Sequence, residues 1–169
     1  MIYIIGVEHF TVQLPNETND KGKVAQFLDH VRNICRERSI TLIAEESSND
    51  SLVYQQIDAT HVGKIVPELN IEYFLCDPGL VERKRIGIKQ RQTIATELSI
   101  PFPPATKDQE DKINEIAAAS DRIREKYWLD EIKSRNGMNR ETLLICGFEH
   151  VDSFIEIARK ENLAVQKSN

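Results

Sequence analysis

The sequence predicts a single α/β domain over residues 1–169, with a mainly parallel β-sheet and helices on both of its faces. Two observations predict this fold. In the first half of the chain, short apolar runs alternate with longer amphipathic ones, and such strand–helix–strand crossovers place successive strands parallel. With 169 residues, 40% of them hydrophobic, the chain also suits one core that needs no disulfide or metal to hold it.

Short runs of β-branched, aromatic and other apolar residues predict the strands. The first run stops at Gly6 and the fourth at Gly147, whereas the second ends at Glu45 and Glu46. The third is followed by Asp77-Pro78-Gly79, a strong turn signal. We therefore expect strands at 1–5, 41–44, 72–76, 143–146 and 164–166.

Apolar residues at helical spacing predict the helices. A less regular helical stretch covers residues 50–69, where Pro67 is expected to mark a break near its end. The other helices are expected at 22–38, 90–98, 107–135 and 151–162. On the longest of them, the expected apolar side consists of Ile113, Ile116, Ile123, Tyr127 and Ile132.

Composition and motif content exclude several classes of protein. The 22 Lys and Arg residues against 27 Asp and Glu give a net charge of −5, which argues against a general nucleic-acid-binding surface. The apolar start of the chain is too short for a signal or membrane segment, so we expect a cytoplasmic protein. The three cysteines form no CxxC pair and are expected to be reduced and buried. GxSxG, HExxH, Walker and GxGxxG motifs are all missing from the sequence.

The most informative feature is a repeated element at two predicted strand ends. Gly6-Val7-Glu8-His9 follows the first strand, and Gly147-Phe148-Glu149-His150 follows the fourth. Ligands of open parallel sheets bind beyond the carboxyl ends of the strands, so His9 and His150 would face one cleft if these strands are neighbours. A single GxxH is a weak pattern, but two copies in a chain with four histidines favour a site.

Three further side chains are candidates for this site. Glu45 and Glu46 end the second strand, where adjacent residues point to opposite faces, so one of them is expected in the cleft. We prefer Glu45 marginally; both could instead favour the dipole of a following helix. Arg124 shares a helix face with Trp128 and either grips a carboxylate or oxyanion or covers the aromatic ring with its stem.

Other polar residues carry weaker signals. Five basic residues lie between Arg83 and Arg91 and could receive an anionic substrate, although a solvated loop is the simpler interpretation. His61 follows Asp58 and could be a further ligand, but nothing in the sequence fixes its direction. His30 lies off the apolar stripe of its helix and is assigned to solvent.

In their order along the chain, these motifs resemble the Tiki/TraB superfamily, which has erythromycin esterases and ChaN-like haem-binding proteins as distant relatives. The two GxxH copies, a glutamate after the second strand and Arg124 on the long helix match that pattern over residues 6–150. The chain departs from it in having glutamate at the third place of both copies. Glu8 and Glu149 either join the site or cap nearby amides.

The resemblance implies a metal-dependent hydrolase of peptide or ester bonds. His9, Glu45, Glu149 and His150 would hold a divalent ion (Mn, Zn, Co or Fe), with Glu46 as the alternative to Glu45. Glu8 would take the proton of the bound water, and Arg124 would stabilise charge on the substrate oxygen.

Two alternatives remain open at this point. In an esterase-like enzyme, histidine and glutamate would activate water without a metal. In a binding module, the cleft would hold haem or another small ligand, with a histidine and Tyr3, Tyr54, Tyr73 or Tyr127 as axial ligands. In each case the expected partner is a small molecule or peptide, which would be anionic if the basic segment Arg83 to Arg91 receives it. A homodimer is allowed for, whereas a membrane or nucleic acid is not expected.

Overall fold

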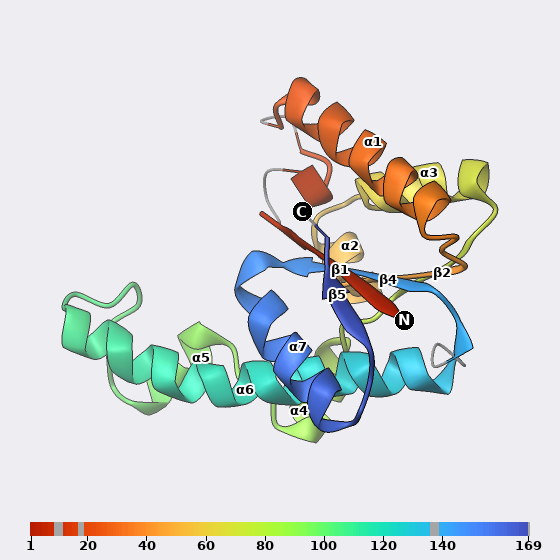
Figure 1. The fold of residues 1–169 in the computed structure, drawn as a ribbon. Coiled ribbons are helices and arrows are strands. Elements are labelled where there is room, and N and C mark those ends of the chain that lie inside the picture. The colour runs from red at the N-terminus through yellow and green to blue at the C-terminus, as the bar shows by residue number, and fades with distance from the viewer. Residues whose placement is uncertain (9–11, 17–18, 136–138, 169) are drawn as a thin grey trace.

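The chain folds around a five-stranded sheet, as a computed structural model describing residues 1–8, 12–16, 19–135 and 139–168 shows. The strand order is β3-β2-β4-β1-β5, and every neighbouring pair is parallel. The predicted single α/β domain with a parallel sheet is confirmed (Figure 1). The strands are β1 (Ile2–Val7), β2 (Leu42–Glu45), β3 (Glu72–Leu75), β4 (Thr142–Gly147) and β5 (Val165–Lys167).

Helices connect these strands, and four of them begin at polar capping residues. Asp20, Ser48, Thr60 and Thr106 each accept a backbone N–H of the first turn that follows, which is the usual way to satisfy these donors. Within the described ranges, no helix is both long and apolar enough to cross a membrane. The helices are α1 (Lys21–Glu37), α2 (Asn49–Tyr54), α3 (His61–Leu69), α4 (Leu80–Ile86), α5 (Arg91–Glu97), α6 (Lys107–Ser134), η3 (Phe148–His150) and α7 (Val151–Lys160).

The sheet is covered on both faces because alternate strand residues are apolar on each side. One face packs against α6 and α7, and the other against α1 and α3 (Figure 1). The α6/α7 side contains Ile4, Leu42, Ala44, Leu144, Trp128, Leu129 and Phe154. The α1/α3 side contains Ile5, Ile43, Leu143, Ile145, Phe27, Val31 and Val62. Helices on both faces are thus as predicted.

The two repeated elements begin next to each other. β1 pairs with β4 in a register that sets Gly6 opposite Cys146 and Val7 opposite Gly147. A Cβ on Gly6 would come 2.8 Å from Val151 Cγ2 and 3.0 Å from Phe148 Cα, so the glycine allows η3 and α7 to pack closely on β1. The glycine of the first element therefore makes room for the second.

Three details differ from the sequence-based expectations. The stretch 50–69 forms two helices, and Pro67 lies inside α3; the interruption comes earlier, where Gln56 has φ 55° and Thr60 caps α3. Ile116 and Ile123 are 37% and 40% exposed, so the expected apolar side of α6 is wrong at those positions. The short helix α4 was not expected at all.

Replacing Gly6 with alanine should destabilise the fold by about 1–3 kcal/mol, because the added methyl group overlaps the α7 side chain and the η3 backbone. Urea unfolding followed by circular dichroism measures this difference. Gly22→Ala, at an exposed helical position, is the matched control and should cost clearly less, because its Cβ meets only the Asp20 side-chain oxygen, at 3.2 Å, and alanine is the better helix former. Equal stability of the two variants would contradict the close approach of β1 and η3.

Candidate active site

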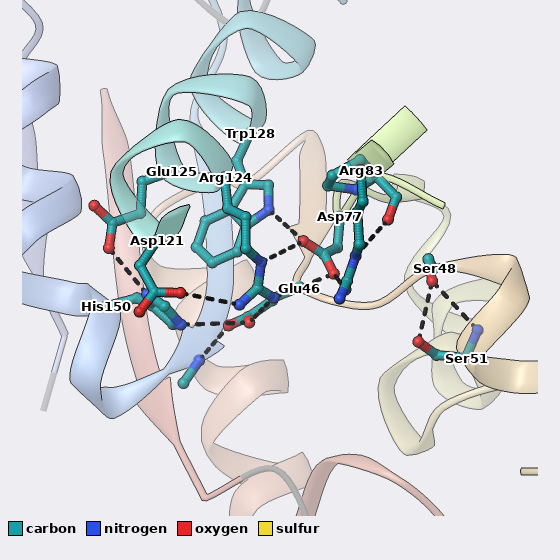
Figure 2. A network of polar contacts seen from close by, with 12 residues as sticks. Glu46, Ser48, Ser51, Asp77, Arg83, Asp121, Arg124, Glu125, Trp128 and His150 are labelled. Carbon is teal, nitrogen blue, oxygen red and sulfur yellow. Dashed lines mark hydrogen bonds and ion pairs between the residues drawn. The ribbon is translucent and has the colours of Figure 1, made fainter. Parts of the chain in front are cut away.

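A cluster of charged side chains lies beyond the carboxyl ends of three neighbouring strands. Glu46 follows β2, Asp77 follows β3, and His150 follows β4, while Arg124 and Glu125 come from α6. Figure 2 shows these groups pointing toward one another in a continuous series of contacts. This is the edge of a parallel sheet at which ligands are usually bound.

Glu46 is the centre of the cluster and is 6% exposed. Its Oε1 accepts a hydrogen bond from Arg124 Nη2 at 2.7 Å, and its Oε2 accepts one from the Gly147 backbone N–H at 2.7 Å. His150 Nε2 lies 3.6 Å from Glu46 Oε1. The carboxylate thus ties the end of β2 to the second repeated element and to α6.

Glu45 faces the opposite side of the sheet. It is fully buried and its Oε2 accepts hydrogen bonds from Thr60 Oγ1 and Tyr73 Oη, both at 2.7 Å. The sequence-based preference for Glu45 over Glu46 was therefore wrong for this cluster. Alternation along the strand explains the result, since Glu46 follows Leu42 and Ala44 on the α6/α7 face.

Arg124 is held by carboxylates rather than directed at open solvent. Nε and Nη2 donate to Asp77 at 3.1 and 3.2 Å, and Nη1 lies 3.5 Å from Asp121 Oδ1. The guanidinium also lies over the Trp128 ring, 5.3 Å from its centroid. Burial lowers the pKa of Arg124, but Asp77 and Glu46 outweigh it and the net pKa is raised, so the group stays charged. Every guanidinium nitrogen is engaged, which makes Arg124 a positioning group for Glu46.

Asp77 is a member of the cluster that sequence reasoning missed. Its carboxylate accepts hydrogen bonds from Trp128 Nε1 at 3.0 Å, from Arg124, and from Arg83 Nη2. Its residue type and place after β3 were visible in the sequence, but the Asp-Pro-Gly signal was interpreted only as a turn. The strand-end rule, applied to β3 as to β2 and β4, would have found it.

Glu125 is the second missed member. His150 Nδ1 and Glu125 Oε1 are 2.9 Å apart, and Ser153 Oγ donates to the same carboxylate oxygen. Glu125 is 1% exposed, and its other oxygen, Oε2, lies 3.8 Å from Arg122 Nη1. With Nδ1–H donated to Glu125, Nε2 is the ring nitrogen that faces Glu46. The pair fixes the orientation of the imidazole.

The pKa of His150 lies above its ordinary value of 6.5. Burial lowers this pKa, but the hydrogen bond to Glu125 and the charge of Glu46 outweigh burial. Nε2 and Glu46 Oε1 are both acceptors when the ring is neutral, so a proton on Nε2, or a water between them, relieves their repulsion. The hydrogen bond to Glu125 and the charge of Glu46 therefore both favour the protonated imidazole.

The described residues do not fit the expected metal centre. Across the ranges that the structure describes, no three His, Cys, Asp or Glu side chains form a group able to hold a metal ion. Glu45, Glu149 and His150 are thus not brought together: Glu45 is on the other face, and Glu149 is exposed. Glu8 is exposed too. His9, an expected ligand, lies outside the described residues.

The remaining candidates lie elsewhere. Burial lowers the pKa of His61, with Lys64 as the next cause, and His61 is at the start of α3. Among the tyrosines offered as axial ligands, Tyr73 binds Glu45, and Tyr54 is 88% exposed. All three cysteines are free and buried, and burial raises the pKa of Cys35 to about 11. Their thiols are not activated as nucleophiles.

The basic segment belongs in part to the site. Arg83 binds Asp77 and the Pro78 carbonyl oxygen, the latter at 2.9 Å. Three others have partners on the surface: Arg85 binds Glu82, Lys89 binds Glu97 at 2.6 Å, and Arg91 binds Asn114 at 2.5 Å. The segment includes α4, so it is not the loop that the simpler interpretation expected.

No protein-family model, no curated protein and no solved structure matches this chain. The candidate site is therefore defined by its own geometry.

His150 should titrate above pH 6.5, and Glu125→Gln should lower its pKa, because the amide cannot favour the imidazolium as the carboxylate does. Carbon-detected NMR of the imidazole signals measures both values. His61, whose pKa burial lowers, is an internal reference.

The raised pKa also predicts a pH dependence of stability. Protonation of His150 is favoured in the folded state, so its stabilisation is complete below about pH 6.5 and is lost as pH rises through the folded pKa. The stability lost in His150→Asn should therefore shrink with rising pH. A wild-type His150 that titrates at or below 6.5 would contradict the arrangement.

Proposed function

We propose that this protein is a hydrolase of ester or peptide bonds that activates water with His150 and Glu46. The observation that carries the proposal is the series Glu125–His150–Glu46–Arg124 at the carboxyl edge of the sheet. An imidazole oriented by a carboxylate is a common arrangement for general acid–base catalysis. The order of the GxxH motifs, which resembles the Tiki/TraB superfamily, supports the same class of reaction.

Each residue has a distinct task in this proposal. Neutral His150 accepts a proton from water through Nε2, while Glu125 holds the ring through Nδ1. The resulting imidazolium is stabilised by the charges of Glu125 and Glu46, and it returns the proton to the leaving alcohol or amine. Arg124 and the Gly147 N–H are positioning groups that fix Glu46.

The metal-dependent version of the reaction rests on the resemblance. In the described part of the chain the donor set does not fit a metal ion, so no step is derived through one. We therefore favour the esterase-like version, in which water is activated by side chains alone. Haem binding would require His150 Nε2 to leave Glu46, and no contact in the site favours it.

The proposal is tested with p-nitrophenyl esters of different acyl length and a panel of fluorogenic peptides. Wild-type protein should hydrolyse members of one set, and His150→Ala and Glu46→Gln should lower kcat/KM by about 100-fold or more. Glu45→Gln, a change of the neighbouring glutamate on the other face of the sheet, is the matched control and should retain activity. Circular dichroism of each variant verifies the fold.

The pH profile and a chelator distinguish the versions. If neutral His150 is the base, kcat/KM rises with pH through an apparent pKa above 6.5. Activity that survives dialysis against EDTA supports the metal-free version, and activity restored only by a divalent ion supports the other. Undiminished hydrolysis by folded His150→Ala, or no turnover of any member of the panel, would refute the proposal.

A further inference from the structure

A cavity opens beside the candidate site, at the ends of β1 and β5. Its volume is about 410 Å³, and its walls come mainly from β1, α1, η3, α7 and the end of β5 with the residue after it. Figure 1 shows the C-terminal end of the chain close to the end of β1. Both repeated elements contribute to the walls, the first through Gly6, Val7 and Glu8 and the second through Phe148. None of these residues belongs to the charged cluster around Glu46.

The interior of this cavity is apolar. Val7 and Phe27 are buried core residues, whereas Phe148 presents a large ring that is 65% exposed. An exposed phenylalanine beside a cavity leaves apolar surface in contact with water. An aliphatic group that covered the ring would remove this surface from water, which lowers the free energy in proportion to the area buried. The cavity therefore favours a ligand with an apolar body.

The rim of the cavity is basic. Lys23 and His30 come from α1, and Lys167 comes from β5. Lys23 has no ion-pair partner within the described ranges, and Lys167 Nζ lies 3.9 Å from a carboxylate of Asp152 that is 92% exposed. Glu8 is the acidic residue among the described lining residues. Among the described lining residues two lysines stand against one carboxylate, and Asp152, which does not line the cavity, offsets part of the Lys167 charge. Lys23 is therefore the main group of the rim that is complementary to an anionic head group.

We propose that this cavity binds an aliphatic carboxylate, with the chain against Phe27 and Phe148 and the head group at Lys23 and Lys167. Such a molecule matches both the apolar interior and the basic rim, which a neutral lipid or a short anion does not. This inference does not rest on the proposed function, because His150 and Glu46 do not line the cavity and the head group lies at Lys23 and Lys167.

Isothermal titration calorimetry with octanoate tests the proposal on the full chain. Octanoate should bind to wild-type protein, and each CH₂ removed in hexanoate and butanoate should weaken binding about fourfold. Octan-1-ol, which lacks the charge, should bind at least about tenfold more weakly than octanoate. The double variant Lys23→Gln, Lys167→Gln should likewise bind octanoate at least about tenfold more weakly than the wild type does.

Matched variants separate the two parts of the ligand. Lys21→Gln changes an exposed lysine of the same helix that does not line the cavity, and should bind octanoate as the wild type does. Phe148→Ala should weaken octanoate binding but leave butanoate binding nearly unchanged, because only the longer chain reaches the ring. The exposed ring makes this change unlike a core truncation.

The outcomes are distinct from those for catalysis. Equal binding of octanoate by the wild type and the double lysine variant, equal binding of octan-1-ol, or no heat at about 5 mM octanoate would overturn the proposal. Glu46→Gln should bind octanoate as the wild type does, because Glu46 does not line the cavity. Octanoate binding without hydrolysis of any ester would refute the proposed function and leave this inference standing.

Discussion

The burial of the Arg124 charge is the constraint on which the candidate site depends. Its side chain is 16% exposed, and its main partners, Glu46 and Asp77, are 5% and 2% exposed. Removing one partner of such a group leaves a buried charge without compensation, at a cost of about 3–5 kcal/mol. Because the two carboxylates follow β2 and β3, this requirement fixes α6 across the ends of both strands. Trp128, one turn further along α6, then donates to Asp77 and packs edge-on against His150.

The position of α6 also determines what the neighbouring groups can do. Glu125 follows Arg124 in the sequence and reaches His150 Nδ1. One helix therefore holds Glu46 through Arg124 and His150 through Glu125. His150 thereby lies between two carboxylates, and its pKa is raised despite its burial. The close approach of β1 and η3 at Gly6 sets the cavity beside this pair. The cavity and the charged cluster thus share η3, through Phe148 and His150, but no side chain.

Periodicity and strand-end rules predict much of this arrangement from the sequence. They predict the parallel sheet, the neighbouring starts of the two repeated elements, and Arg124 as a member of the site. They do not choose between Glu45 and Glu46, because a shift of one residue in the alternation along β2 would move each glutamate to the opposite face of the sheet. Glu125 has no spacing signal of its own, and its role depends on the rotation of α6. Ile116 and Ile123 look apolar at helical spacing, yet tertiary packing leaves them exposed.

A double-mutant cycle of Glu46→Gln and Arg124→Gln, measured by urea unfolding, tests the central interaction most directly. A buried pair with a 2.7 Å hydrogen bond should show a coupling free energy of about 1.5–3 kcal/mol. The same cycle with Glu45→Gln in place of Glu46→Gln should be additive within about 0.5 kcal/mol, because Glu45 binds Thr60 and Tyr73 on the other face. Additive changes for Glu46 and Arg124, or equal coupling through Glu45, would contradict the assignment of Glu46 to the site.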